Sequence, residues 1–286
     1  MKKLLLAINA FNRPYTLKLL LTYLEYVGFS YPFIVLDHGS TDSEQIALLK
    51  SLQSNKKPGN CLDIIKFDVN QYKGNFACGF ARKNCIDFLL DKYSNYDYFF
   101  VIDCDILINN KTIEICLEDF QKLRDCNYKV ATYSPYSFVD GNNFVIDNVI
   151  YSNAVIGGDA SVFYDRKALI DIGNNFGAFP GGFGDYQWYC GRRKGYLHIT
   201  RLSPVSEIQH LGILDGCVCE RPYRPFWLND LLRDCKTGQY VSIKDFNPFE
   251  FYLLAKRFGC KVACDKFLEK FEQEFLSTTV ERDCLT

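Results

Sequence analysis

Two aspartates separated by one residue, Asp103 and Asp105, are the residues of this sequence best suited to hold a cation. They directly follow the apolar run Tyr96–Ile102, which is typical of a buried strand at the centre of a sheet. Two carboxylates placed this close repel each other unless a cation is bound. Carboxylate oxygens suit Mg²⁺ or Mn²⁺, ions that usually bridge to substrate phosphates. The pattern therefore favours a divalent-cation site over a solvated loop or a helix cap.

Polar residues also follow two earlier apolar runs. The run Lys3–Asn9 leads into polar residues up to Arg13, and the run Phe33–Leu36 leads into the polar turn 37–42. Both runs are short enough to be strands, and each ends in groups that could contact a ligand.

The segments between these runs have helical periodicity. A helix beginning at Pro14 would place four leucines between 17 and 24 on one face and end at Gly28. The alternation of strands and helices is the signature of βαβ units, which predicts an α/β fold with a mostly parallel sheet. Ligands bind beyond the carboxyl ends of such strands, where the polar groups would converge. The further elements predicted are a strand over 62–67 and helices from Ser43 and over 75–90.

The second half of the sequence predicts different secondary structure from the first. It becomes rich in strand-forming residues after residue 125 and contains a hairpin signal at Asp140-Gly141-Asn142. From about residue 221 the sequence is helical, and we expect this segment to pack on the main domain. The elements predicted between them are a helix from Asp185 to Arg193 and a strand over Val205–Gln209 that leads to His210.

Composition narrows the function classes. The formal net charge of −1 over 286 residues gives no electrostatic case for a nucleic-acid partner. No apolar run approaches the ~20 residues of a transmembrane helix. The N-terminal run is interpreted as a buried strand and not as a signal peptide, because Asn9 and Asn12-Arg13 interrupt it. These observations predict a cytoplasmic protein, with peripheral contact of the C-terminal helices with a membrane left open.

The 13 cysteines are expected to be mostly free thiols. Structural zinc is the weaker alternative, because the pairs Cys217/Cys219 and Cys260/Cys264 lack Cys-x-x-Cys spacing with a nearby histidine.

Five segments, in order along the chain, resemble a GT-A glycosyltransferase of the family 2 type over residues 3–215. The resemblance implies a Rossmann-like fold with a GT-A domain over 1–220, divided into a nucleotide-sugar half (1–105) and an acceptor half (106–220). Residues 221–286 would form a helical C-terminal extension. The segments are Ala7–Pro14, Val35–Asp42, Asp103–Asp105, Gly157–Arg166 and Gly184–Trp188.

The resemblance also implies a donor site for a nucleoside-diphosphate sugar, with a UDP-sugar favoured. Phe11 would lie against the nucleobase, and Asp37 would accept a hydrogen bond from its ring NH. Asn9 and Arg13 would join the donor site, and Asp103 would contact the ribose or the metal. Arg82 is a weaker candidate for the diphosphate.

The cofactor implied is Mn²⁺ or Mg²⁺, held by Asp103 and Asp105 with His210 as a third ligand. The metal would neutralise the charge of the departing nucleoside diphosphate.

The acceptor, a glycan or another hydroxyl compound, would meet Gly158, Tyr186 and Trp188. Asp185 would be the general base, giving inversion at the sugar carbon. This sequence departs from the family at Gly184 and Gln187, which leaves Asp185 the only carboxylate of that element. A helix cap is the alternative role for Asp185.

Two other functions remain in competition with a metal-dependent inverting glycosyltransferase. A catalytically degenerate module that binds nucleotide-sugars or glycans would explain the departures at Gly184 and Gln187. A sugar-nucleotide pyrophosphorylase is disfavoured, because the segment Asn9–Arg13 lacks the glycine-rich, lysine-bearing loop that this class requires. The sequence leaves the donor sugar, the acceptor and the oligomeric state open.

Overall fold

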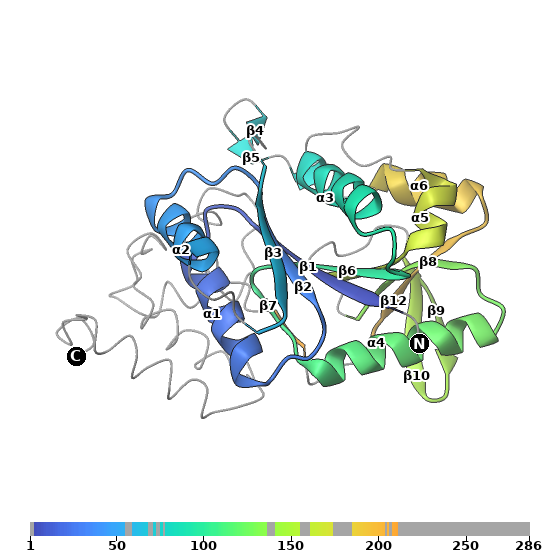
Figure 1. Cartoon of the computed structure of the whole chain (residues 1–286). Coiled ribbons are helices and arrows are strands. Elements are labelled where there is room, and N and C mark those ends of the chain that lie inside the picture. Colours follow the sequence, from blue (N-terminus) through green and yellow to red (C-terminus); the bar gives the residue numbers. More distant parts are fainter. Residues whose placement is uncertain are drawn as a thin grey trace, which may run out of the picture.

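A sheet of nine strands in the order β3-β2-β1-β6-β11-β8-β12-β10-β9 forms the centre of the protein (Figure 1). The computed structural model describes residues 3–54, 59–67, 71–72, 75–76, 78–135, 141–154, 161–173, 185–203, 205 and 208–210. The strands of the sheet are β1 (Leu4–Ala10), β2 (Phe33–Asp37), β3 (Cys61–Lys66), β6 (Tyr98–Asp103), β8 (Val130–Ser134), β9 (Gly141–Ile146), β10 (Val149–Ala154), β11 (Ser161–Asp165) and β12 (Leu197–Arg201).

The first four strands of this sheet in chain order, β1, β2, β3 and β6, are parallel to one another. Of the other five strands, β8, β12 and β9 run in the same direction as these four. Strands β11 and β10 run in the opposite direction. The predicted α/β class with a mostly parallel sheet is therefore confirmed for the described residues. The assignment to the GT-A family and the domain boundaries stay predictions.

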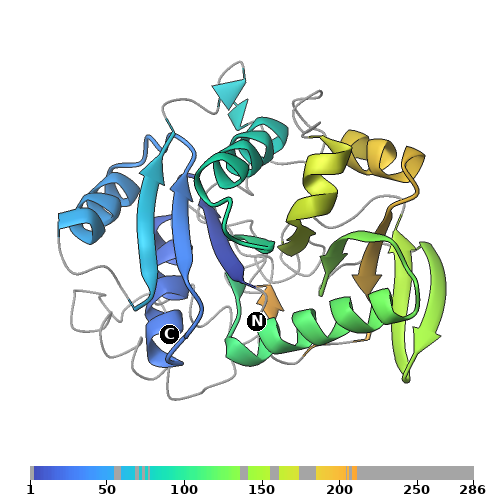
Figure 2. The same ribbon diagram turned by 45° about the vertical axis from the view of Figure 1, so that its right-hand side comes forward.

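Helices cover both faces of the sheet (Figure 2). Alternate residues of β1 enter two separate cores, because successive side chains of a strand point to opposite faces. Leu4, Leu6 and Ile8 pack in the core that includes α1 and α4, whereas Leu5 and Ala7 pack against α3. The first face carries α1 (Pro14–Tyr26), α2 (Ser43–Ser54) and α4 (Asn110–Asp125), and the second carries α3 (Cys78–Lys92), α5 (Arg166–Ile172) and α6 (Asp185–Arg193).

Local sequence explains where several helices begin. Pro14 stands in the first turn of α1, where its missing N–H costs nothing. Asn109 and Thr112 form a reciprocal capping box at the start of α4. Gly28, with φ of 59°, follows α1 in the left-handed conformation that glycine adopts without strain.

The third helix starts later than predicted. The sequence predicted a helix over 75–90, but Asn75–Phe76 forms β5, which pairs with β4 (Gln71–Tyr72) in a small antiparallel sheet. Helix α3 therefore begins at Cys78. Strand pairing, a non-local interaction, overrides the helical periodicity at this end of the segment.

The predicted hairpin turn at Asp140-Gly141-Asn142 is wrong. Gly141 is the first residue of β9, and the hairpin turns at Asp147-Asn148, between β9 and β10. Both turn residues have positive φ, 49° and 65°. Two-residue hairpin turns of type I′ need this conformation at both central positions, and Asp and Asn tolerate it better than most residues.

Of the segment predicted as a strand, Val205–Gln209, the structure describes 205, 208 and 209. Val205 and Ile208 are not in a strand, whereas Gln209–His210 forms β13, which pairs with β7 (Ile106–Leu107). The predicted C-terminal extension, 221–286, lies outside the described residues, as do the paired cysteines within and near it. No helix in the described part of the chain is long and apolar enough to span a membrane.

Candidate functional site

Three predicted site residues lie at the carboxyl edge of the parallel strands. Asn9 in β1 is in register with Asp103 in β6, and the next residue, Ala10, is in register with Asp37 in β2. Backbone bonds extend this alignment beyond the strands, because the carbonyl of Asn9 accepts from Cys104 N at 3.0 Å. The strand ends thus bring together residues that are about 30 and 90 positions apart in sequence.

These three residues do not all share one face. Asn9 and Asp103 each lie two positions after a residue that packs against α3, namely Ala7 and Val101. They therefore belong to the α3 face. Asp37 follows Leu36 of the same core by one position and so belongs to the opposite face.

Asp103 is the more exposed carboxylate of the pair. Its side chain is 37% exposed, and Arg82 of α3 reaches it with Nη2 3.6 Å from Oδ1. Arg82 is itself buried beneath the edge, with 7% of its side chain exposed.

Asp105 is buried and paired with Arg13. Nη1 of Arg13 donates to Oδ2 of Asp105 at 3.0 Å, and the Asp105 side chain is 3% exposed. Each carboxylate of the pair therefore has an arginine beside it. These two guanidinium groups relieve the repulsion between the carboxylates and place fixed positive charge at the edge.

The loops after β1 and β2 are joined by Asn12. Its Oδ1 accepts from the backbone N–H groups of Thr41 (2.8 Å) and Asp42 (2.9 Å), and its own N–H donates to Ser40 Oγ at 2.9 Å. Asn12 has φ of 50°, a conformation that asparagine tolerates better than most residues. These hydrogen bonds join the two loops into one polar platform. At the end of the second loop, Asp42 Oδ1 accepts from Gln45 N at 2.8 Å in the first turn of α2.

Asp37 is completely buried in this structure. Its Oδ1 accepts from the hydroxyl of Ser40 at 2.5 Å, and its Oδ2 accepts from Ser40 N at 3.2 Å. The carboxylate shapes the turn after β2. Its predicted contact with a nucleobase stays a prediction.

His38 is a site residue that the sequence interpretation passed over. Its ring is buried, with Nε2 2.9 Å from Asn9 Oδ1, and it stacks on Phe67 with centroids 5.2 Å apart. Burial, together with the charge of Arg82, lowers the pKa of His38 to about 3. The ring is therefore neutral at physiological pH. Its position directly after Asp37 was the available signal, but a buried histidine is not distinguishable from an exposed one in such a turn.

The donor chemistry at the edge fits a hard divalent cation. Asp103 and Asp105 offer carboxylate oxygens, which Mg²⁺ and Mn²⁺ prefer. The pairing of β13 with β7 puts the backbone of His210 opposite Ile106, the residue after Asp105. The backbone of His210 therefore lies near Asp105, while the side chain of His210 lies outside the described set. Within the described residues no group of three or more His, Cys, Asp or Glu side chains is placed to hold a metal.

The predicted catalytic and acceptor residues are placed only in part. Asp185 is the first residue of α6, as predicted, and Tyr186 and Trp188 lie in the same helix, but their side chains are outside the described set. Gly158 is also outside the described residues. Phe11 lies in the loop after β1, half-buried.

Helix α6 is held against the sheet at Gly191. A Cβ atom at this position would lie 2.8 Å from Nε2 of His198 in β12. His198 is buried and its Nδ1 is 2.8 Å from the hydroxyl of Thr132 in β8. Glycine at 191 therefore sets how closely the helix that begins at Asp185 approaches the sheet.

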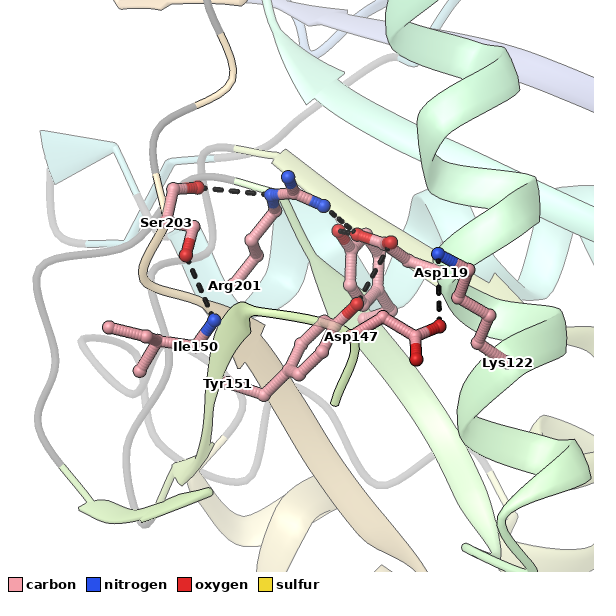
Figure 3. Close-up of polar contacts among 8 residues, drawn as sticks. Asp119, Lys122, Asp147, Ile150, Tyr151, Arg201 and Ser203 are labelled. Carbon is pink, nitrogen blue, oxygen red and sulfur yellow. Dashed lines mark hydrogen bonds and ion pairs between the residues drawn. The ribbon is translucent and has the colours of Figure 1, made fainter. Parts of the chain in front are cut away.

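A second polar cluster, centred on Asp119 of α4, lies in the other half of the sheet (Figure 3). Asp119 accepts from the hydroxyls of Tyr133 (2.5 Å) and Tyr151 (2.9 Å) and forms an ion pair with Arg201. Burial is the main cause that raises the pKa of Tyr133. The contacts tie α4 to β8, β10 and β12. We interpret this cluster as structural, because its members satisfy one another.

The thiols described fit the prediction of free cysteines. The free thiols are those of Cys61, Cys85, Cys104, Cys116, Cys126 and Cys190.

Fold and site together define a mixed α/β protein whose parallel strands end in a cluster of carboxylates, arginines and amides. This is the place at which open α/β sheets bind ligands.

No protein-family model and no curated protein sequence matches the chain. Among solved structures it is similar to S. aureus TarS at 11% identity, with a TM-score of 0.47, over 98% of this chain and 50% of that one. It is also similar to residues 1–349 of S. aureus TarS at 14% identity and a TM-score of 0.42, over 98% of this chain and 76% of that one. The complex of TarS 1–349 with UDP-GlcNAc gives 13% identity and a TM-score of 0.45, over 98% of this chain and 82% of that one. This chain thus spans half the length of the first of these structures. Because all three scores lie below 0.5, the site is interpreted from its own residues.

Proposed function

We propose that this chain is a metal-dependent, inverting glycosyltransferase that moves a sugar from a nucleoside diphosphate to a hydroxyl group. A UDP-sugar is the favoured donor and a glycan the favoured acceptor. The proposal combines the motif resemblance of the sequence with the geometry of the strand edge.

The observation that carries the proposal is the position of Asp103 and Asp105 at the carboxyl end of the buried strand β6. Asn9 lies in register beside Asp103, and Arg13 and Arg82 flank the two carboxylates. An edge that offers carboxylates and guanidinium groups together can bind both a divalent cation and a diphosphate. A purely structural ion pair would not require a half-exposed carboxylate at this place.

Asp103, Asp105 and His210 would hold Mg²⁺ or Mn²⁺, which would supply charge neutralisation for the departing diphosphate. Arg13 and Arg82, which pair with these carboxylates, would add fixed positive charge for the same diphosphate.

The platform formed by the loops after β1 and β2 would bind the nucleoside. In this proposal Phe11 lies against the base and Asp37 accepts from the base NH. Because the hydroxyl of Ser40 donates to Asp37, base recognition would exchange or share that hydrogen bond.

In the transfer step the acceptor oxygen attacks the anomeric carbon of the donor sugar. A new carbon–oxygen bond forms as the bond to the diphosphate breaks, and the nucleoside diphosphate leaves with the bonding electrons. Asp185 would take the proton of the acceptor hydroxyl. Attack opposite the leaving group inverts the anomeric carbon, and Gly158, Tyr186 and Trp188 would position the acceptor.

A binding module without turnover is the second candidate. Gln187 stands where the resemblance leads us to expect a carboxylate, and it is buried with 1% exposure. The presence of glutamine in place of a carboxylic acid favours the interpretation that the chain binds its ligand but does not catalyse transfer.

The test is release of free nucleoside diphosphate from a panel of nucleotide-sugars, with Mn²⁺ or with EDTA. Asp105→Ala and Asp185→Asn are compared with Asp87→Asn, an exposed aspartate of α3 paired with Lys83. We expect metal-dependent release from one donor that both site variants lose and the control keeps.

Release that survives Asp105→Ala or EDTA would contradict metal dependence. No release, combined with calorimetric binding of UDP, would point either to a missing acceptor or to the binding module. Absence of both release and binding would contradict a nucleotide-sugar site.

A further inference from the structure

A line of polar contacts runs behind the strand edge on the α3 face. The ring of His38 stacks on Phe67, at an angle of 19° between the rings, and its Nε2 lies 2.9 Å from Asn9 Oδ1. Asn9 is in register with Asp103, the half-exposed carboxylate of the edge. The proposed roles in transfer use Asn9 and Asp103 but do not use His38.

Strand geometry places His38 on the β2 side of Asn9. His38 follows β2, and its backbone N–H donates to the carbonyl of Ala10 at 2.9 Å. Asp103 lies on the other side of Asn9, in β6. The amide of Asn9 is thus located between an imidazole on one side and a carboxylate on the other.

The imidazole can anchor only one end of this amide. A neutral ring carries one N–H, and in the Nε2–H form that group donates to the carbonyl oxygen Oδ1 of Asn9. The amide NH₂ group of Asn9 then points away from His38, toward β6. An asparagine with no such anchor would sample both orientations of its amide, since oxygen and nitrogen are nearly equal in size.

We propose that His38 is a positioning residue, which holds Asn9 so that the amide N–H groups face Asp103 and the oxygen atoms of a nucleoside diphosphate bound beyond the edge. The ligand class rests on the proposed function. The low exposure of Asn9, 8%, means that one oriented amide edge, and not a freely turning side chain, meets the ligand.

Two substitutions separate this role from simple packing. His38→Phe keeps an aromatic ring against Phe67 and removes the N–H. His38→Gln keeps an N–H donor near the position of Nε2 and removes the ring. A packing role predicts that Phe is the milder change, and a positioning role predicts that Gln is.

The first measurement is a double-mutant cycle on the affinity for UDP. Calorimetry in the presence of Mg²⁺ measures this affinity. We expect His38→Phe and Asn9→Ala each to weaken binding about five- to tenfold, the loss of one oriented hydrogen bond. His38→Phe added to Asn9→Ala should cause no further loss, because His38 acts through Asn9. His38→Gln should stay within about twofold of the wild type.

Additive losses in the double variant would overturn the proposal, as would full affinity in His38→Phe. Thermal unfolding of each variant shows whether the fold is kept.

The second measurement needs neither ligand nor variant. Long-range ¹⁵N–¹H spectra of the wild-type chain report which ring nitrogen of His38 carries the proton between about pH 5 and 8. We expect the Nε2–H form. The Nδ1–H form would overturn the proposal, since Nε2 could then not donate to Oδ1.

The two measurements keep this inference distinct from the proposed function. If the wild type does not bind UDP, the proposed function fails, and the spectra alone decide whether His38 orients Asn9. If UDP binds and the tautomer is Nδ1–H, the proposed function stands and the role of His38 is wrong.

Discussion

Arg13 Nη1 lies 3.0 Å from Asp105 Oδ2 and joins the loop after β1 to the chain that leaves β6. Both side chains are largely buried, so the pair is shielded from solvent and its two partners depend on each other.

Arg13→Gln should therefore leave a buried carboxylate without its cation. We expect the free energy of unfolding in urea to fall by about 2–3 kcal/mol. Lys83→Gln, which breaks an exposed ion pair with Asp87 on α3, should cost less than about 0.5 kcal/mol. The double variant Arg13→Gln/Asp105→Asn should recover part of the loss. A loss equal to that of Lys83→Gln would show that the Arg13 pair does not stabilise the fold.

Asn12 joins two loops and holds a positive φ of 50°. Asn12→Ala should destabilise the protein by about 2–3 kcal/mol, because it loses the side-chain hydrogen bonds and adds about 1–2 kcal/mol of left-handed strain. Asn12→Gly also loses the hydrogen bonds but adopts the left-handed conformation without strain. Its stability should therefore lie between those of the wild type and Asn12→Ala. Urea unfolding measures both changes. Equal stability of the Gly and Ala variants would contradict strain at this position.

Gly191 permits the close approach of α6 to His198. In Gly191→Ala the new methyl group would lie 2.8 Å from Nε2 of His198, so we expect a loss of about 1–3 kcal/mol. Lys167→Ala, at an exposed position of the neighbouring helix α5, is the control and should change stability by less than about 0.5 kcal/mol. Because α6 begins at Asp185, nucleoside diphosphate release should also fall in Gly191→Ala. Wild-type stability in that variant would mean that the helix adjusts freely.

His38 should make the fold sensitive to acid. Its pKa is lowered from 6.5 to about 3, first by burial and then by Arg82. Between these values the unfolded chain binds a proton that the folded chain does not, so stability falls as the pH drops from about 6.5 toward 3. This residue contributes a slope of stability against pH that approaches about 1.4 kcal/mol for each pH unit, because a shift of one pKa unit corresponds to that free energy.

The measurement is urea unfolding of the wild type and His38→Phe near pH 6.5 and near pH 4.5. Asn9 and Phe67 contact the ring and Arg82 acts on it electrostatically, and these three residues are the same in the two proteins. We expect the wild type to lose more stability than the variant over this interval. Equal losses would show that His38 is protonated in the folded state.

Much of the parallel half of the fold was predictable, because its signals are local. The strands β1, β2, β3 and β6 have short apolar runs, and α1 has both its periodic leucines and Pro14. The polar residues that end these runs identify the strand edge without any knowledge of packing. The order of the strands beyond β6 was not predictable, since β11 enters the sheet beside β6 through pairing between residues about 60 positions apart.

The amino-acid sequence by itself determined that the chain is α/β and that Asn9, Asp37, Asp103 and Asp105 lie at, or just after, the ends of buried strands. Only the tertiary structure decided what each of these groups touches. Arg13 meets Asp105 across 92 positions, and His38 meets Asn9 across 29, because parallel strands fold distant chain segments into register. Hydrophobic periodicity is a property of neighbouring residues, whereas an ion pair or an oriented amide depends on which strand lies beside which. The edge is therefore visible in the sequence, and its chemistry is set by packing.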